Sequence, residues 1–352
     1  MWNNSFTKNL GIEYPIIQAP MLGVSTPEMA AAASNQGSLG SLAIGGLSPE
    51  ATIDLVRKTK KLTSKPFAVN LFAHSVPGYS ISDIKPMQDF LLYLAHKRGY
   101  ALKESDLYNF KFYTWQDQVD ALIQENISII SFTFGCLDNE TIKQLQDRNC
   151  VLIGTATSTD EALYLQKHNI DMICVQGIEA GGHRGTFLTH DPLPQVGLFS
   201  LLPQIAASTS LPCIAAGGIH NVQSMRAAFD LGAVAVQIGT AFIGTEESIA
   251  IYSYKQRLET AKDTDSSITR AFSGRWARGL RNEMMREIEN SGIAIPPYPI
   301  MNSLTATFRK LAQQNNDDDY TNLWAGQSPK PSAKHTGTVL INLIKEYENL
   351  YK

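Results

Sequence analysis

The sequence is poor in the features that mark disulfide-rich, metal-binding and membrane-spanning proteins. Its 352 residues contain only four cysteines, and no two of them form a C-x-x-C pair. Because the cysteines mostly lie in or beside apolar runs, we expect reduced core residues and no metal site. No apolar run approaches the roughly 20 residues that cross a bilayer, and the N-terminus lacks the pattern of a signal peptide. A cytoplasmic location without a membrane partner is therefore expected.

An excess of charge is lacking as well. The formal net charge is −3 and no run of Lys or Arg occurs, which argues against nucleic acid and favours a small-molecule partner. The motifs G-x-S-x-G, G-x-x-x-x-G-K-[ST] and H-E-x-x-H are missing. The hydrophobic fraction of 43% still allows a large core. We therefore expect a chain that folds on its own, as a monomer or homodimer, and acts on a small molecule.

What the sequence does contain is an alternation of short apolar runs with helix-length amphipathic segments. This pattern predicts parallel strands joined by crossover helices, and nearly continuous apolar strands indicate a sheet covered on both faces. Eight strands favour an α/β fold of the closed (β/α)8 TIM barrel type, with an open doubly wound sheet as the alternative. The eight runs are 15–20, 38–46, 66–72, 127–135, 150–157, 171–177, 211–218 and 233–240.

Two regions interrupt this rhythm. Residues 73–126 are too long for one crossover, so we expect an insertion that places an extra helix over the barrel mouth. The chain beyond the eighth strand reads mainly as helices. We therefore predict a TIM barrel over 1–250, a smaller helical cap domain over 251–320, and a return segment with a final helix packed on the barrel over 321–352.

Glycines follow the seventh and eighth predicted strands, at the face where (β/α)8 barrels carry their active sites. Loops at these two positions commonly bind a phosphate through backbone N–H groups, and glycine lets the backbone approach the oxygens. Taken singly, each of the two glycine segments could instead serve only to form a tight turn between a strand and a helix. The predicted phosphate site combines Gly217 and Gly218 with Gln237, Ile238, Gly239 and Thr240.

A phosphate bound there would place the rest of its ligand over the ends of strands one, three and six. Those ends offer amides that both donate and accept hydrogen bonds, as the pyrimidine edge of a flavin requires, and backbone with little bulk for its ring. Each amide would serve equally well in a turn. The candidates are Asn70 and Gln176 for the pyrimidine edge, and Pro20, Met21, Gly181 and Gly182 beside the ring.

His183 lies in the sequence AGGHRGTF, on the loop after the sixth predicted strand. The glycines before it clear a path for a planar ligand, so the imidazole is placed to face a substrate. We therefore predict that His183 is catalytic. For Arg184, an anion contact and a structural ion pair are equally consistent with the sequence. Several aromatic residues are candidates for the pocket wall or, equally, for the cap core: Tyr298, Tyr108, Phe110, Phe112 and Tyr113.

Several stretches resemble the class I nitronate monooxygenases, also called 2-nitropropane dioxygenases. The resemblance runs through nearly the whole chain, and its most specific element is AGGHRGTF together with the downstream GRWARG. The matching stretches are 18–50, 176–187, 215–242 and 272–282, followed by YPIMNSLT and LWAGQ.

The resemblance implies a TIM-barrel flavoprotein that holds FMN without a covalent link and oxidises alkyl nitronates with O2. Propionate 3-nitronate is the usual substrate of the family, and an oxo acid with nitrite and nitrate are the usual products. The active-site role falls on His183, and the flavin contacts fall on Asn70, Gln176, Gly181, Gly218 and the 237–240 segment. The sequence departs from the family at Val24, where a glycine is common, and at Met301, where a glutamine is common. Met301 is therefore a second candidate, beside Tyr298, for the substrate pocket.

A nitronate is already a carbanion equivalent, so the enzyme needs no strong base. We favour a role in which His183 orients or neutralises the nitronate through a charge-assisted hydrogen bond; a neutral nitroalkane would instead require it to take the α-proton. Two other functions remain open. One is an NADH-dependent flavin reductase of the enoyl-carrier-protein or quinone type, and the other is a non-catalytic sensor or scaffold for a phosphate-containing ligand.

Overall fold

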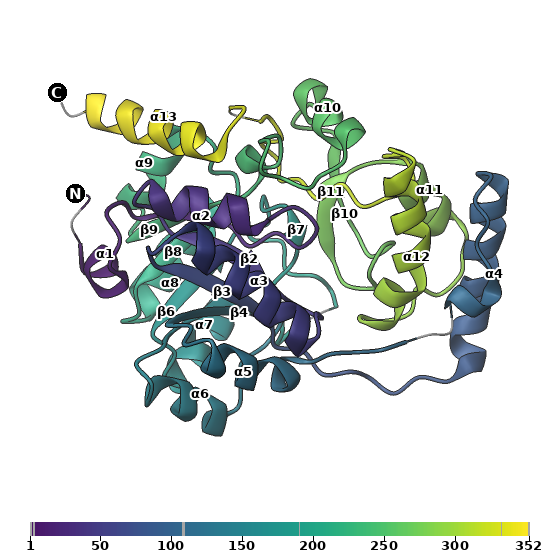
Figure 1. The fold of residues 1–352 in the computed structure, drawn as a ribbon, viewed down its shortest axis with the longest axis horizontal. Helices are drawn as coiled ribbons and strands as arrows, with labels where there is room; N and C mark the ends of the chain where they lie inside the picture. Colours follow the sequence, from purple (N-terminus) through teal and green to yellow (C-terminus); the bar gives the residue numbers. More distant parts are fainter. Residues whose placement is uncertain (1, 3, 108–109, 190, 332, 351–352) are drawn as a thin grey trace.

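The computed structural model describes residues 2, 4–107, 110–189, 191–331 and 333–350. A barrel of alternating strands and helices forms one half of the molecule, and a second lobe lies beyond one of its ends (Figure 1). The two termini lie at the opposite end of the barrel from this lobe.

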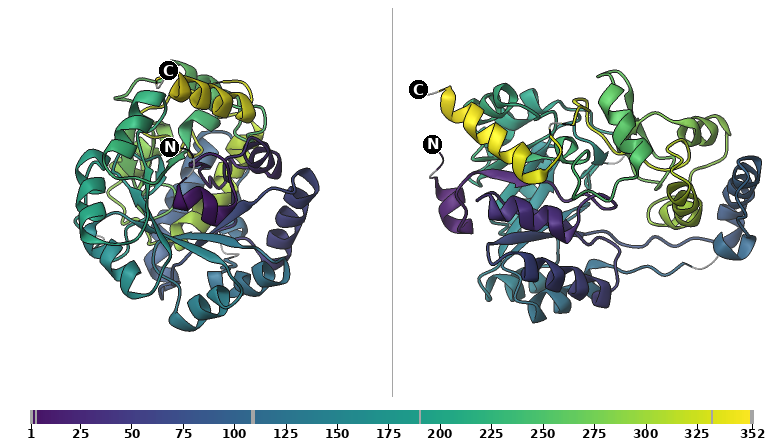
Figure 2. Two further views of the ribbon diagram at one scale, coloured as in Figure 1. Left: turned by 90° about the vertical axis from the view of Figure 1, so that its left-hand side faces the viewer. Right: turned by 45° about the horizontal axis from the view of Figure 1, so that its top comes forward.

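Eight parallel strands form the barrel sheet, and each coincides with a predicted apolar run. Their order is β1-β9-β8-β6-β5-β4-β3-β2, and a parallel bridge from Ile17 in β1 to Leu39 brings the two ends of the sheet together. Helices surround the strands as a ring in the left view of Figure 2. The TIM barrel prediction is therefore confirmed over the open sheet. The strands are β1 (Ile16–Gln18), β2 (Gly40–Ala43), β3 (Phe67–Phe72), β4 (Ile129–Thr133), β5 (Val151–Ala156), β6 (Met172–Gln176), β8 (Cys213–Ala216) and β9 (Ala235–Ile238).

The helices of the barrel begin at capping residues. The side chain of Thr26 accepts a hydrogen bond from the amide of Met29, and that of Ser158 accepts one from the amide of Glu161. Such caps satisfy N–H groups that the first turn of a helix leaves without partners. The barrel helices are α1 (Ser5–Leu10), α2 (Pro27–Asn35), α3 (Pro49–Leu62), α5 (Trp115–Gln124), α6 (Asn139–Gln146), α7 (Thr159–Lys167), α8 (Leu198–Ser208), α9 (Val222–Asp230) and α13 (Thr336–Asn349).

The second lobe has its own hydrophobic core, built from the insertion and the cap. Met87 and Leu91 of α4 (Ile81–Lys97) pack in one cluster with Met285 of α11 (Glu283–Asn290) and with Leu304 and Phe308 of α12 (Ile300–Gln314). The right view of Figure 2 shows α4 joined to the barrel by two extended segments. The insertion thus contains a helix, α4, which packs on the cap core and contributes no residue to the cavity at the barrel mouth. The lobe also contains the short 3₁₀ helix η1 (Glu104–Leu107) and α10 (Tyr252–Thr260).

The cap also contains strands that the sequence analysis did not predict. The strands β10 (Ser266–Thr269) and β11 (Ala277–Leu280) pair antiparallel, and β11 pairs in turn with β7 (Gly182–His183). In this register Ala277 lies opposite His183. The loop after β6 is therefore held by a strand of the cap.

None of the helices within the described ranges combines the length and the apolar character needed to cross a membrane. The described residues also contain no group of three or more His, Cys, Asp or Glu side chains placed to hold a metal ion. All four cysteines are free of disulfides, and Cys150, Cys174 and Cys213 are buried as expected.

Candidate active site

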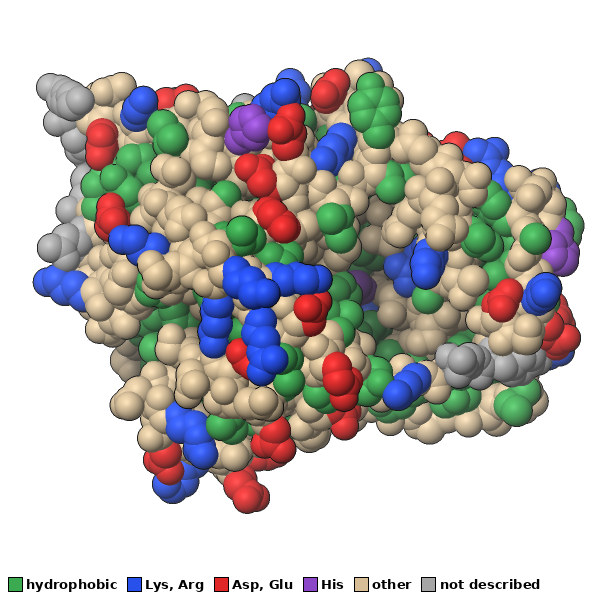
Figure 3. Space-filling model, in the orientation of Figure 1, with side chains coloured by type: hydrophobic (Ala, Val, Ile, Leu, Met, Phe, Trp, Pro, Cys, Tyr) green, Lys and Arg blue, Asp and Glu red, His purple; other side chains and the backbone are tan. Residues whose placement is uncertain are grey.

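A cavity of about 360 Å³ lies where the carboxyl ends of the barrel strands face the cap. The space-filling view shows the surface hollowed between the two lobes (Figure 3). Most of the predicted site residues meet in the wall of this cavity. They are Pro20, Met21, Asn70, Gln176, Gly181, Gly182, His183, Gly217, Gly218, Gln237, Gly239 and Thr240.

The two glycine segments leave backbone donors without partners. Gly217 and Gly218 have φ values of 117° and 69°, which side-chain-bearing residues rarely adopt. The N–H groups of these glycines and of Gly239 donate to no residue in the described part of the chain. Unpaired N–H groups are costly unless a ligand or water accepts from them, so this wall suits an anion such as a phosphate. The Oγ1 of Thr240 accepts from the amide of Gly326 at 3.0 Å, which leaves its hydroxyl proton available.

The three amide side chains of the site differ in what they can offer a ligand. The amide of Gln237 forms no hydrogen bond to any described residue, and Asn70 uses only its Nδ2, which donates to Ser131 at 2.9 Å. Gln176 donates through Nε2 to the carbonyl of His183 at 3.0 Å and accepts at Oε1 from the amide of Gly185 at 2.8 Å. Gln176 therefore holds the His183 loop, which corresponds to the turn-forming role that the sequence analysis gave as the alternative to a flavin contact.

Some predicted site residues do not belong to the cavity wall. Ile238 and Met301 are 0% exposed and pack in the barrel core and the cap core, respectively. Met301 belongs to the hydrophobic cluster of the cap and is not among the residues that line the cavity. Tyr298 lies behind the wall, with its ring 6.0 Å from that of His183. The other aromatic candidates lie elsewhere: Phe110 and Phe112 pack against the cap core, Tyr113 contacts Lys111, and Tyr108 is outside the described residues.

The imidazole of His183 is surrounded by rings and is neutral at neutral pH. Its centroid lies 5.3 Å from that of Trp324 and 5.5 Å from that of Phe134, and Nε2 lies 2.8 Å from Oγ of Ser273. Burial lowers the pKa of His183 to about 3, and the charges of Arg275 and Arg309 act in the same direction. The ring therefore carries no charge in the ligand-free protein.

Two arginines beside His183 support its loop. Arg184 is 0% exposed, and its guanidinium donates to the backbone carbonyls of Gln176 and Gly177. Its carbonyl accepts from Arg275, whose guanidinium lies 4.0 Å above the ring of Phe134 and also donates to the carbonyl of Thr186. Arg184 thus has a structural role through backbone carbonyls; among the described residues it forms no ion pair, and it is not in the cavity wall.

A buried carboxylate fixes the end of the same loop. Glu161, at the start of α7, is 1% exposed. Its oxygens accept from the amide and hydroxyl of Thr157, from the hydroxyl of Thr186, and from the amides of Phe187 and Leu188. Both oxygens of this buried side chain are therefore satisfied by hydrogen-bond donors. The His183 loop is thereby attached to the barrel as well as to the cap.

Arg309 is the functional candidate that the sequence analysis missed. It projects from α12 into the cavity wall together with Asn302 and Gln313. The spacing of these positions places them on one face of a helix whose opposite face is apolar, and that polar stripe is a signal the sequence contains. Burial lowers the pKa of Arg309 to about 10, so the guanidinium is still charged at neutral pH.

Comparison with known proteins identifies one family over nearly the full chain. A family model described as nitronate monooxygenase matches residues 3–346. A probable nitronate monooxygenase from Staphylococcus aureus strain MRSA252 is 40% identical over 353 residues, covering 99% of both chains. The protein of the same description from strain N315 is 39% identical with the same coverage.

Solved structures show the same likeness. A nitroalkane oxidase from Streptomyces ansochromogenes has a TM-score of 0.89 and 32% identity, with 99% of each chain covered. FabK from Thermotoga maritima has a TM-score of 0.77 and 26% identity, covering 100% of this chain and 98% of its own. The enoyl reductase domain of MlnA from Bacillus amyloliquefaciens, at 14% identity and a TM-score of 0.67, shares the fold.

Proposed function

Because the chain belongs to the nitronate monooxygenase family, we propose that it is an FMN-dependent enzyme that oxidises alkyl nitronates with O2. Propionate 3-nitronate is the expected substrate, and an oxo acid with nitrite and nitrate are the expected products. The observation that carries the proposal is one cavity with unpaired N–H groups at its glycine segments and His183 in its wall. An anionic cofactor end and a substrate-facing imidazole fit these two features.

The donor set of the barrel wall fits FMN. The N–H groups of Gly217, Gly218 and Gly239 would bind the phosphate, and the free amide of Gln237 with Oδ1 of Asn70 would meet the polar edge of the ring. When bound, FMN would supply the redox chemistry by taking electrons from the substrate and passing them to O2. The chain itself then has to bind, orient and exclude water.

His183 would act on the substrate as a neutral group. Its pKa of about 3 means that the ring is neutral at neutral pH in the ligand-free protein, so the charge-assisted bond expected from the sequence would take its charge from the nitronate. The hydroxyl of Ser273 can hold either neutral tautomer through Nε2, which leaves Nδ1 for the nitronate. The positive charge near the substrate comes instead from Arg275 and Arg309.

An anaerobic absorbance experiment tests the function. The purified protein is loaded with FMN and mixed without oxygen with either propionate 3-nitronate or NADH. Bleaching of the flavin by the nitronate, with NADH producing none on the same time scale, is the expected result. Prompt bleaching by NADH alone would support the flavin reductase instead, and a protein that stays colourless after FMN is added would contradict the cofactor.

A further inference from the structure

The cap wall of the cavity carries a charged group whose partners are all neutral. The guanidinium of Arg309 donates to Oγ1 of Thr305 at 3.0 Å, to Oδ1 of Asn322 at 2.7 Å and to Oδ1 of Asn302 at 2.9 Å. Within the described chain it forms no ion pair with a carboxylate. Since a charge removed from bulk water is costly without a counter-charge, the cavity is the place from which an anion would come.

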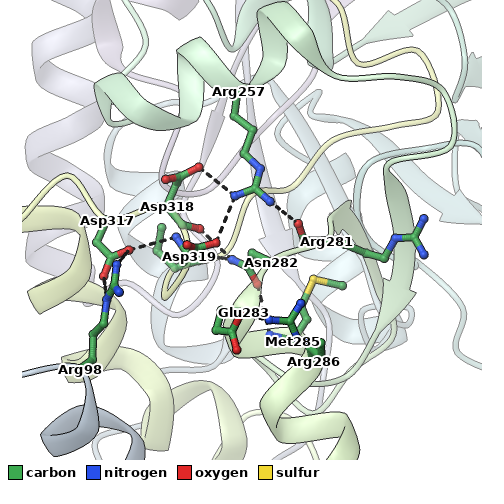
Figure 4. A network of polar contacts seen from close by, with 11 residues as sticks. Arg98, Arg257, Arg281, Asn282, Glu283, Met285, Arg286, Asp317, Asp318 and Asp319 are labelled. Carbon is green, nitrogen blue, oxygen red and sulfur yellow. Dashed lines mark hydrogen bonds and ion pairs between the residues drawn. The ribbon is translucent and has the colours of Figure 1, made fainter.

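Other arginines of this lobe are treated differently. Arg98 pairs with Asp317 at 2.8 Å, and Arg257 pairs with Asp318 at 3.0 Å, as Figure 4 shows. Carboxylates are thus available in the same lobe, yet none is placed beside Arg309. Other arginines of the cap also lack a carboxylate partner within the described residues, but they donate to backbone carbonyls and do not line the cavity: Arg270, Arg275, Arg278 and Arg281. Arg309 differs from them because it lines the cavity.

The two asparagines beside Arg309 add further donors to the cavity wall, whereas Gln313, which donates through Nε2 to Thr321, adds one amide oxygen. The side-chain oxygens of Asn302 and Asn322 both face the guanidinium, so each amide keeps its NH₂ group for another partner. Neither NH₂ group donates to any residue in the described ranges, although both asparagines line the cavity. One N–H of Nη1 on Arg309 also remains, because the other donates to Asn322. A donor-only group of this kind matches a carboxylate.

We propose that Arg309, together with Asn302 and Asn322, forms a carboxylate-binding subsite that selects nitronates bearing a carboxylate at the end remote from the nitro group. The inference rests on the proposed function. The nitronate group is placed beside His183, on the loop after β6, whereas the subsite lies on α12 and the segment that follows it. An alkyl nitronate without a carboxylate would leave the guanidinium of Arg309 without a counter-ion. A dianion of suitable length would place its nitronate group beside His183 and its carboxylate beside Arg309.

Steady-state rates with two nitronates test the subsite. The measured quantity is the ratio of kcat/KM for propionate 3-nitronate to kcat/KM for butyl 1-nitronate, which has a similar length and no carboxylate. In Arg309→Met this ratio should fall by on the order of 10- to 100-fold, because a charge-assisted hydrogen bond is lost. The change should appear in KM for the carboxylated substrate, since the carboxylate is remote from the reacting atoms. Arg309→Lys keeps the positive charge, so in this variant the ratio should fall by less than in Arg309→Met.

The matched control is Lys310→Met, which removes the same charge from an exposed neighbouring position of α12 and should leave the ratio unchanged. A binding measurement without turnover accompanies the rates: anaerobic titration with 3-nitropropionate, followed by flavin absorbance, should give a higher Kd in Arg309→Met. Equal losses for both nitronates in Arg309→Met would overturn the subsite and place the guanidinium on the nitronate group.

The wild-type protein provides a test that does not depend on a folded variant. In the wild type, the ratio of kcat/KM for propionate 3-nitronate to kcat/KM for butyl 1-nitronate should exceed about 10, because one charge-assisted hydrogen bond distinguishes the two substrates. A ratio near one would overturn the subsite. Failure of the proposed function looks different, because then neither nitronate would bleach the flavin at all.

Discussion

At the scale of single residues, the lowered pKa of His183 determines how this side chain contributes to stability as the pH changes. With a pKa of about 3, the folded protein keeps this ring neutral, whereas the unfolded chain protonates it below about pH 6.5. Because the folded pKa is the lower one, His183 costs stability as the pH falls from about 6.5 towards 3. Above that window its contribution to stability does not change with pH.

We expect kcat/KM for the nitronate to show no inflection from His183 between about pH 5 and 8, since the ring does not titrate there. His183→Ala should keep its FMN but lose on the order of 100-fold or more in kcat, with a pH profile of unchanged shape. Steady-state rates across that range, with FMN occupancy read from absorbance, check both points. A wild-type kcat in the variant would contradict the catalytic assignment.

The residues of this site divide into those that local sequence could identify and those that it could not. His183 and the glycine pairs follow directly after apolar strands, so strand position alone brings them to the barrel mouth. Arg309 and Met301 lie on one helix, and only the packing of α12 decides that the first faces the cavity and the second the cap core. The use of Gln176 inside the loop likewise depends on a tertiary turn.

Glu161 is a residue whose loss should disturb the His183 loop without touching the cavity. In Glu161→Gln one of the two oxygens becomes an NH₂ group, which would face either the donors of Thr157 or those of Thr186 and Phe187. We expect the free energy of unfolding to fall by about 2 to 3 kcal/mol, because hydrogen bonds to a buried carboxylate are lost. Urea unfolding measures the change, and Asp160→Asn, an exposed neighbour on α7, is the control. Equal midpoints for the two variants would count against this role.

At the scale of elements, the barrel was predictable and the small cap sheet was not. Each barrel strand lies within a largely apolar run, as expected for strands that are covered on both faces. Such runs are visible in the sequence. The strands β10 and β11 are four residues long, and their sequences SSIT and ARGL show no sustained alternation. The partner that completes their sheet is the two-residue β7, which exists only because the loop after β6 meets the cap.

The turn after β9 provides a test of the phosphate site. An added Cβ at Gly239 would meet only the side chains of Ala19 and Met21, at 3.6 Å, and its φ of −115° is open to any residue. Gly239→Val should therefore fold, while its side chain occupies space beside the unpaired N–H groups. We expect the Kd for FMN to rise by on the order of 10-fold or more. This is the change in Kd that corresponds to the free-energy cost of one overpacked contact.

Fluorescence titration of the FMN-free protein measures this Kd, and thermal unfolding reports whether the fold is intact. Gly78→Val is the control, because an added Cβ there meets no atom within 4 Å. A Gly239→Val protein that binds FMN as tightly as the wild type would remove Gly239 from the phosphate site.

At the scale of the whole molecule, an ion pair connects parts of the chain that are distant in sequence. Arg98, at the end of α4, donates through Nε and Nη2 to the carboxylate of Asp317 (Figure 4). Tyr100 donates to the same group at 2.7 Å. No local pattern could predict this contact, because it joins the insertion to the segment that leaves α12. It attaches α4 to the wall element that carries Arg309.

The charge state of Asp317 makes this attachment sensitive to acid. Burial opposes the charged carboxylate, but the hydrogen bonds from Arg98 and Tyr100 outweigh it and hold the pKa of Asp317 below its ordinary value. A lowered carboxyl pKa contributes stability above the unfolded value of about 3.9, and the contribution is lost as the pH falls through the folded pKa. The ion pair should therefore attach α4 to the segment after α12 at neutral pH and be lost in acid.

Asp317→Asn should expose this dependence. At pH 7 we expect hydrogen exchange in α4 and α12 to be about 10-fold faster in the variant than in the wild type, because charge-assisted bonds are replaced by weaker ones. The difference should shrink as the pH falls from about 3.9 through the lowered pKa of Asp317, where the folded wild-type carboxylate also takes up a proton. Asp89→Asn, which alters an exposed pair with Lys85 on α4, should leave the exchange unchanged. A difference between Asp317→Asn and wild type that persists undiminished in acid would mean that the carboxylate acts through its shape and not through its charge.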